Sequence, residues 1–133
     1  MKLLLALALF GTALILTEGR LQKYSVQGRL RCGSAPAQNV ELKLVDKDPG
    51  RDDEMAVGRT DSSGRFTIQG QNNEMSNIDT VLKIYHDCSD TNKPCQRKWK
   101  MHLPDKYINR GTLDIGDINL ELGWQDEERD CFH

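Results

Sequence analysis

The chain has 133 residues, with 18 lysines and arginines against 20 aspartates and glutamates, and a formal net charge of −2. A balance this close to neutral gives no basic surface that would indicate nucleic-acid binding. The length suffices for one domain with one hydrophobic core, and not for two.

The first residues have the parts of a secretory signal peptide. Lys2 precedes an apolar run from Leu3 to Leu16, and small and polar residues follow. The run is shorter than the roughly 18 apolar residues that crossing a bilayer takes. We therefore expect residues 1–19 to be removed, residues 20–133 to form a secreted, extracellular domain, and no transmembrane span to be present.

Alternating apolar and polar residues then predict about seven strands. No stretch has a convincing helical period, and Gly, Asp and Ser mark the turns. This pattern indicates an all-β sandwich. In chain order, the predicted strands cover residues 23–32, 40–46, 54–59, 65–70, 80–88, 96–103 and 112–122.

Several of these segments carry more specific expectations. Residues 54–59 and 65–70 are joined by TDSSG, which suits a tight turn, so we expect them to form a hairpin. Residues 80–88 are apolar in both phases, which predicts a central strand with His86 in or near the core. In residues 96–103, Arg97, Trp99 and Met101 share one face, and Lys98 and Lys100 share the other.

The last predicted strand changes phase at Gly116. A β-bulge there would return the strand to one inward face. We expect this face to carry Leu113, Ile115, Ile118, Leu120 and Leu122.

Four cysteines follow the predicted leader, and an oxidising compartment usually pairs an even set. Cys88 and Cys95 flank the turn-rich stretch SDTNKP between two strands, so we expect a disulfide that closes a hairpin. Their spacing fits neither a common zinc site nor a redox-active C-x-x-C pair. Cys32 would then bond Cys131 and fasten the acidic tail.

Four stretches together resemble the transthyretin-like family of secreted nematode proteins: VQGRLRCGSAPAQNVELKLVDKD, GRTDSSGRFTIQG, LKIYHDCSDTNKPCQRKWKMHLPDKYIN and DIGDINLELGWQDEERDC. The resemblance implies a seven-stranded transthyretin-type β-sandwich and an extracellular location. It implies no fixed activity, although one member bridges phosphatidylserine on dying cells to an engulfment receptor. The related hydroxyisourate hydrolases carry a Y-R-G-S signature that this chain, ending RDCFH, lacks.

Residues 46–54, DKDPGRDDE, gather carboxylates between two predicted strands. Ca²⁺ takes six to eight oxygen ligands, and acidic loops at one end of a sandwich can supply them. The spacing matches no EF-hand, and a solvated acidic loop is the alternative. The calcium candidates are Asp46, Asp48, Asp52 and Asp53, and no other metal or cofactor is expected.

The other notable stretch, KPCQRKWK (residues 93–100), contains four cationic side chains. The alternative to a binding site here is a solvated face over an inward-packed Trp99. The candidate partner-binding residues are Lys93, Arg97, Lys98, Lys100 and His102.

These features predict a secreted binding protein that recognises an anionic, phosphatidylserine-like cell surface, a cell-surface receptor, or both. The alternative is an oligomeric carrier of a small apolar ligand. A hydrolase is less favoured, and we expect no enzyme, because the histidines have no partnering serine or second cysteine. The three histidines are His86, His102 and His133.

Overall fold

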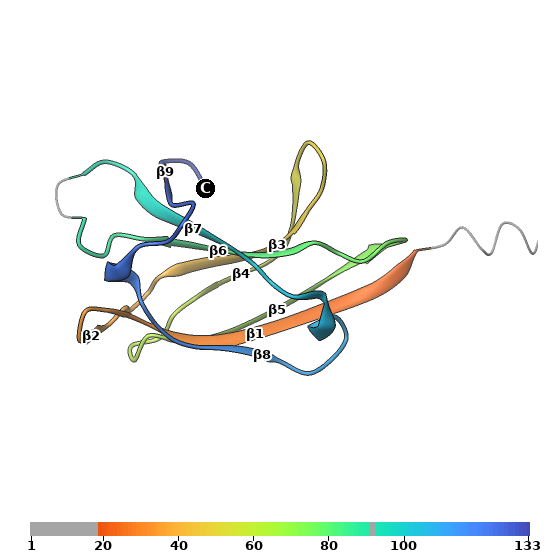
Figure 1. Ribbon diagram of the computed structural model, residues 1–133, viewed down its shortest axis with the longest axis horizontal. Helices are drawn as coiled ribbons and strands as arrows, with labels where there is room; N and C mark the ends of the chain where they lie inside the picture. The colour runs from red at the N-terminus through yellow and green to blue at the C-terminus, as the bar shows by residue number, and fades with distance from the viewer. Residues whose placement is uncertain (1–18, 91–92) are drawn as a thin grey trace, which may run out of the picture.

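Two β-sheets stacked face to face form the domain in the computed structural model, which describes residues 19–90 and 93–133 (Figure 1). The first sheet contains β1 (Arg20–Cys32), β2 (Ala35–Pro36), β5 (Arg65–Glu74) and β8 (Leu113–Asn119). The second sheet has the order β4 (Asp52–Arg59), β3 (Glu41–Lys47), β6 (Thr80–His86), β7 (Gln96–His102) and β9 (Glu128–Asp130).

The predicted all-β sandwich with its seven strands is confirmed, and β2 and β9 are two short additions to it. Short 3₁₀ turns, η1 (Asp105–Tyr107) and η2 (Leu120–Leu122), flank β8. Among the described residues, no helix has the length and apolar character that a membrane crossing requires. The predicted signal peptide, residues 1–19, lies outside the described residues except for Gly19 and stays a prediction.

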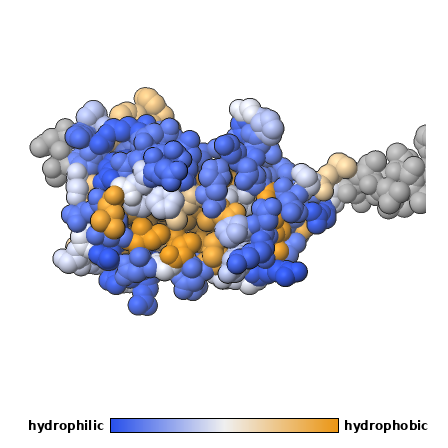
Figure 2. All heavy atoms as spheres, in the orientation of Figure 1, coloured by the Kyte–Doolittle hydropathy of each residue, from blue (hydrophilic) through white to orange (hydrophobic). Residues whose placement is uncertain are grey.

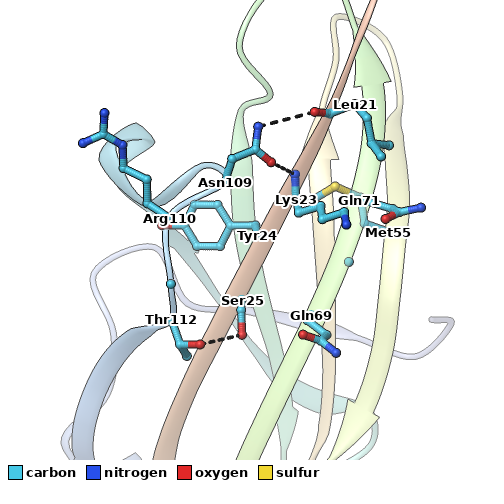
Figure 3. A pocket seen from close by; sticks show the side chains of 12 residues that line it. Leu21, Lys23, Tyr24, Ser25, Met55, Gln69, Gln71, Asn109, Arg110 and Thr112 are labelled. Atoms are coloured by element: carbon cyan, nitrogen blue, oxygen red, sulfur yellow. Dashed lines mark hydrogen bonds between the residues drawn. The ribbon is translucent and has the colours of Figure 1, made fainter.

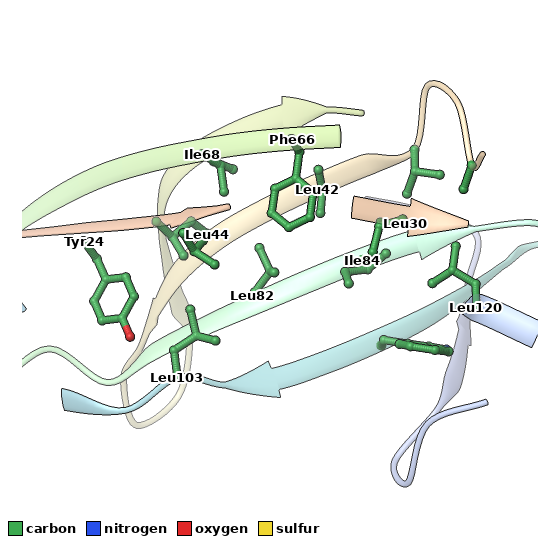
Figure 4. Packing of buried hydrophobic residues seen from close by; sticks show 14 of the residues in the cluster. Tyr24, Leu30, Leu42, Leu44, Phe66, Ile68, Leu82, Ile84, Leu103 and Leu120 are labelled. Atoms are coloured by element: carbon green, nitrogen blue, oxygen red, sulfur yellow. The ribbon is translucent and has the colours of Figure 1, made fainter. Parts of the chain in front are cut away.

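The core lies between the two sheets, and strand alternation creates it (Figure 4). On β1, Tyr24, Val26 and Leu30 are at most 1% exposed. On β3, Leu42 and Leu44 are fully buried and face them. Burying each side chain of this kind contributes about 1.5–3 kcal/mol relative to leaving it exposed, so this inward stripe is the main source of stability.

The predicted bulge in β8 is confirmed. β8 runs parallel to β1, and the register advances from Gln27 opposite Asp114 to Arg29 opposite Asp117, so β8 holds one extra residue. Gly116 has a φ of 77°, which favours glycine. The bulge lets β8 keep its apolar residues on the side of the core.

Most of the predicted inward face of the last strand also forms. Half-buried residues of β8 pack against the core from the open seam between β7 and β8, where Figure 2 shows an apolar patch. Leu120 is fully buried, but Leu122 is 82% exposed, which contradicts the prediction. The reason is that β8 ends at Asn119 and η2 follows, so the two-residue period no longer applies. The half-buried residues are Leu113, Ile115 and Ile118.

The predicted hairpin of residues 54–59 and 65–70 is wrong, although the turn between them exists. β4 belongs to the second sheet and β5 to the first, so residues 60–64 cross from one layer to the other. Thr60 Oγ1 donates to Ala37 O at 2.6 Å, and Gly64 O accepts from Leu30 N at 2.7 Å. The first bond ties the crossing to the loop before β3, and the second ties it to β1 of the first sheet. Alternation alone cannot distinguish a hydrogen-bonded neighbouring strand from a strand that faces it across the core.

The predicted disulfide pairing is also wrong. The structure bonds Cys32 to Cys88 and Cys95 to Cys131, with Cα–Cα distances of 5.6 and 4.3 Å. The expected Cys88–Cys95 bond does not form, although β6 and β7 are antiparallel neighbours. Their ladder ends at the pair His86–Arg97, two residues before the positions where the two cysteines would lie opposite each other. The first bond joins the two sheets and the second holds the tail.

Side-chain direction explains the bond between the sheets. Cys88 follows the buried His86 by two residues and is itself 8% exposed, so it points toward the first sheet. Cys32 follows the buried Leu30 by two residues at the end of β1 and points toward the second sheet. The two sulfurs therefore meet in the interior.

Strand register explains the other bond. Gln96 at the start of β7 lies opposite Asp130 of β9. This register places Cys95, the residue just before β7, opposite Cys131, the residue just after β9. A sequence pattern gives no sign of this register, since β9 is only three residues long.

Candidate functional site

Carboxylates replace apolar residues on the inward faces of two strands where the core ends. On β3, Asp46 continues the stripe of Leu42 and Leu44 and is only 1% exposed. β5 belongs to the sheet that faces β3, and its buried apolar residues are Phe66 and Ile68. Asn72 and Glu74 continue the inward face of β5 beyond them. The interior of the sandwich therefore closes at this end with acidic groups.

Four carboxylates converge here: Asp46, Asp48, Asp53 and Glu74 each offer an oxygen that lies within 4.8 Å of the others. Asp46 is buried and the other three are half-buried. Within the described residues, none of the four forms an ion pair with a lysine, arginine or histidine. The cluster is therefore a concentration of negative charge that the described basic side chains do not neutralise.

Neutral donors fix the orientation of the cluster. Asn72 Nδ2 donates to Asp46 Oδ2 at 3.0 Å and to Asp53 Oδ2 at 3.4 Å. The backbone N–H of Asp79 donates to Asp46 Oδ1 at 2.9 Å. The buried side chain of Gln22 donates to the carbonyl of Glu74 at 3.2 Å, which anchors the end of β5. These contacts preorganise the carboxylates.

The proximity of the carboxylates perturbs their titration. A hydrogen bond shared with Asp46, together with burial and the neighbouring negative charges, raises the pKa of Glu74 to about 7. A hydrogen bond shared with Asp53 likewise raises the pKa of Asp48. Both directions follow from crowding like charges, and a bound cation would reverse that effect.

The set differs from the sequence prediction by one residue. Asp46, Asp48 and Asp53 were predicted, but Asp52 lies on the opposite face of β4 and pairs with Lys83 Nζ at 2.6 Å. Glu74 was missed because it lies on β5, far along the chain. The two-residue period of β5 could have identified it, because Glu74 lies an even number of residues after the inward-facing Phe66 and Ile68 and so faces the same side.

A second feature of this end is an orphan hydroxyl. Thr80, at the start of β6, is 1% exposed, and its Oγ1 has no hydrogen-bond partner among the residues that the structure describes. Thr80 lies directly opposite Asp46 in the β3–β6 ladder, and both side chains are on the core side. Opposite residues of a ladder have Cβ atoms about 4.5–5.5 Å apart, so this unpaired oxygen borders the cluster.

Carboxylate and hydroxyl oxygens are ligands of hard cations. Ca²⁺ takes six to eight such ligands in flexible geometry, whereas Mg²⁺ demands near-ideal octahedral geometry. Four carboxylates from three strands and a loop fit the looser requirement of Ca²⁺, with water or an external anion completing the coordination. The cluster contains no thiolate or imidazole that would favour zinc.

The predicted cations do not form one free surface. Arg97 faces inward, is 9% exposed, and pairs with Glu127 at 2.6 Å. Lys98 and Lys100 share the outer face of β7, where both lie within 3.4 Å of Glu128. The tail thus neutralises three of the four predicted residues on this strand, namely Arg97, Lys98 and Lys100.

The remaining two candidates, Lys93 and His102, are exposed at opposite ends of the β7 region. The structure does not bring them together with the other three. Their assignment as partner-binding residues stays a prediction.

Comparison with known proteins agrees with this architecture. The model of the Transthyretin-like family matches residues 27–104. The chain belongs to the transthyretin-like family. Transthyretin-like protein 5 of Caenorhabditis elegans is 44% identical over all of both chains, and transthyretin-like protein 33 is 41% identical over 84% of this chain and 83% of its own.

Among solved structures, the chain is similar to part of a 9R-lipoxygenase from Cyanothece. It covers 75% of this chain at 24% identity with a TM-score of 0.46, and this chain covers 16% of it. A likeness at this level carries no argument about function.

A groove of about 900 Å³ lies beside β1, between β5 and the loop before β8 (Figure 3). Amide, hydroxyl and basic side chains form much of its wall, including Gln69, Gln71, Asn109 and Lys23. The lining is mixed, because Leu21, Tyr24 and Met55 also border the groove. Pockets for small apolar ligands are lined mainly by hydrophobic and aromatic side chains, so the groove gives no specific support to an apolar-ligand carrier.

His86 is buried as predicted, at 2% exposure. Its Nδ1 accepts from Cys88 N at 3.1 Å, and in the described part of the chain Nε2 has no hydrogen-bond partner. Burial, together with the nearby Arg97 charge, lowers the pKa of His86 to about 4, so the ring is neutral at physiological pH. Neither this groove nor a second one beside Arg29 and Arg65 is lined by a histidine.

Proposed function

We propose that this family member is a secreted extracellular binding protein, and that its carboxylate end holds Ca²⁺ and joins the protein to an anionic group on a cell surface. The observation that carries the proposal is the convergence of four carboxylates that form no ion pair with a basic side chain in residues 19–90 and 93–133. The two disulfides support an extracellular setting, since such bonds persist in oxidising compartments.

The need for a counter-ion favours a bound cation. Asp46 is buried, and charged groups in an interior are normally paired or coordinate a metal. Extracellular calcium modules bind with dissociation constants of about 10⁻⁴–10⁻³ M, which matches the calcium concentration outside cells. A site open to solvent on one side, as the half-buried Asp48 and Asp53 indicate, suits that weak range.

Calcium also supplies an attraction for anions that the lysines of β7 do not. Those lysines are already paired with the acidic tail, so they have little capacity to attract an anionic lipid. A calcium ion with incomplete protein coordination accepts further oxygen ligands. The phosphate and carboxylate oxygens of a phosphatidylserine headgroup have the required chemistry.

Vesicle pelleting tests the proposal. The parent protein should pellet with phosphatidylcholine vesicles that contain phosphatidylserine only when millimolar calcium is present, and not with phosphatidylcholine alone. Asp46→Asn should abolish this calcium-dependent fraction. Asp52→Asn is the matched control, because it removes a carboxylate of the same loop that pairs with Lys83 instead of the cluster.

Three results would contradict the proposal. One is calcium-independent pelleting, another is equal loss in both variants, and the third is no pelleting of the parent at any calcium concentration up to about 10 mM, well above the affinity range of extracellular sites. Circular dichroism of each variant shows whether it is folded before the comparison is made.

A further inference from the structure

The acidic tail, residues 123–133, occupies the outer edge of the second sheet. Its strand β9 pairs antiparallel with β7 through three residue pairs, from Gln96 opposite Asp130 to Lys98 opposite Glu128. β7 would otherwise be an edge strand with unpaired backbone groups, which readily accept another strand. The tail is therefore seated where a separate peptide could add to the sheet.

The side chains of the tail complement those of β7 in charge. Lys98 Nζ lies 3.1 Å from Asp130 and 3.4 Å from Glu128, and Lys100 Nζ lies 3.1 Å from Glu128. On the inward side, Glu127 accepts from both Arg97 and the indole N–H of Trp99. Each face of β7 thus contacts a carboxylate of the tail.

Aromatic residues of the tail on either side of β9 also contact the second sheet. The His133 ring stacks on Tyr85 with centroids 3.9 Å apart, and Trp124 stacks on Trp99 at 5.5 Å. Trp124 Nε1 also donates to the Lys100 carbonyl at 2.9 Å. Tyr85 lies on the outer face of β6, yet it is only 2% exposed.

Most of the polar contacts are individually weak. Ion pairs that remain partly open to solvent, such as Lys100–Glu128, contribute little individually, and three ladder pairs form only a short strand. The bond between Cys95 and Cys131 fastens the far end of the tail, which otherwise is joined to the domain only through η2, and by analogy with short linkers it holds that end at an effective concentration in the millimolar range. The contact between the tail and β7 thus depends strongly on that bond.

The two disulfides differ in access to solvent. Cys131 is exposed and Cys95 is half-buried, whereas in the other bond Cys32 is half-buried and Cys88 is 8% exposed. Thiol–disulfide exchange requires a thiolate to reach a sulfur, so the tail bond is the more accessible one. An extracellular reductant would therefore open the tail bond before the interior one.

We propose that the edge of β7 is a binding site for an acidic, extended peptide segment of another protein, and that the tail fills this site until the Cys95–Cys131 bond is reduced. The tail itself shows the chemistry of the partner, a strand with carboxylates spaced to meet Lys98 and Lys100. Strand addition supplies backbone hydrogen bonds, and the lysines supply selectivity.

The opening step needs a dithiol as reductant. Its two sulfhydryls give two electrons and two protons to the Cys95–Cys131 bond, which becomes two thiols, and the dithiol becomes a disulfide. No other covalent bond changes. This inference is independent of the calcium proposal, because it involves the other end of the second sheet.

Peptide binding tests the inference. The probe is a fluorescent peptide with the sequence of residues 123–133 and the change Cys131→Ser, measured by anisotropy. The Cys95→Ser/Cys131→Ser variant should bind it at least about tenfold more tightly than the parent, because the site is no longer held closed. Adding Lys98→Glu to that variant should remove the gain, as should a peptide with lysine at positions 128 and 130.

A second arm uses the unaltered protein, in case the double variant does not fold. Mild treatment with a dithiol should open the Cys95–Cys131 bond first, as peptide mapping of alkylated thiols would show, and should give the same gain in peptide binding. Hydrogen exchange at residues 128–130 should accelerate at the same time.

Several results would overturn the inference. They are equal peptide binding by closed and opened forms, binding that ignores Lys98→Glu, and earlier opening of the Cys32–Cys88 bond. If the opened form instead pellets with phosphatidylserine vesicles and does not bind the peptide, the edge recognises a membrane and the peptide assignment is wrong.

Discussion

Calcium should stabilise the folded protein, and the size of the effect follows from the site. A ligand that binds only the folded state adds RT ln(1 + [L]/Kd) to the free energy of unfolding. With a dissociation constant of about 1 mM, typical of a half-exposed extracellular site, 10 mM calcium contributes about 1.4 kcal/mol. For a domain of this size, that raises the melting temperature by about 5 °C.

The effect should depend on pH because Glu74 must lose its proton to bind the ion. The shared hydrogen bond with Asp46 raises the pKa of Glu74 from its ordinary 4.5 to about 7. At pH 8 the group is ionised, but at pH 6 about nine-tenths of it is protonated, which weakens calcium about tenfold. The expected contribution at pH 6 is then about 0.4 kcal/mol, or a shift of roughly 1–2 °C.

Differential scanning fluorimetry at pH 6 and pH 8, with and without calcium, measures both quantities. Magnesium at the same concentration is the control for ionic strength and divalent charge. The reasoning fails if calcium produces no shift at pH 8, if magnesium matches it, or if Asp46→Asn leaves the shift intact. Asp52→Asn should keep the full shift, because Asp52 does not face the cluster.

The remaining predictions concern stability. Replacing Cys32 and Cys88 with serine should lower the melting temperature more than replacing Cys95 and Cys131. The closed loops of 56 and 36 residues differ by only about 0.4 kcal/mol in chain entropy. The larger loss is expected because the first bond joins the two sheets in the interior. An equal loss on thermal unfolding would refute this. Gly28→Ala should cost about 1–3 kcal/mol in urea unfolding, because its Cβ would lie 2.7 Å from the Ile115 side chain at the bulge, and an unchanged midpoint would contradict that packing.

Strand existence could be predicted from the sequence because alternation is a local property. The stripe of Tyr24, Val26 and Leu30 is visible in the sequence and buried in the fold. The change of phase at Gly116 likewise announced the bulge, since only an extra residue keeps Ile115 and Ile118 on one side. These are statements about neighbours in the chain.

Partner strands and partner cysteines could not be predicted in the same way, because they depend on register between distant segments. Four cysteines allow three pairings, and the observed one follows from β9 lying against β7. The same contact places acidic groups on Lys98 and Lys100, which the sequence presented as free cations. Three residues of β9 carry too weak a periodic signal to be recognised as a strand.

The candidate metal site combined both kinds of information. Asp46, Asp48 and Asp53 lie in one loop region and were visible as a cluster, although Asp52 could not be separated from them without knowing which way each side chain points. Glu74 required the facing of β3 and β5 across the sandwich. Its parity on β5 was available, but which strand would face it was not.

A purely structural role and a calcium-binding role for this end predict different responses to Glu74→Gln. The amide keeps the size of the side chain and can donate to Asp46, while it removes one negative charge from a crowded set. The raised pKa of Glu74 means that its contribution to stability is fully present below pH 4.5 and is lost as the pH rises through 7. At pH 8 without calcium, the variant should therefore melt at a higher temperature than the parent. With 10 mM calcium the order should reverse, because the parent gains a ligand that glutamine supplies poorly. A variant that is more stable than the parent under both conditions would show that the carboxylates are only a solvated, self-repelling surface.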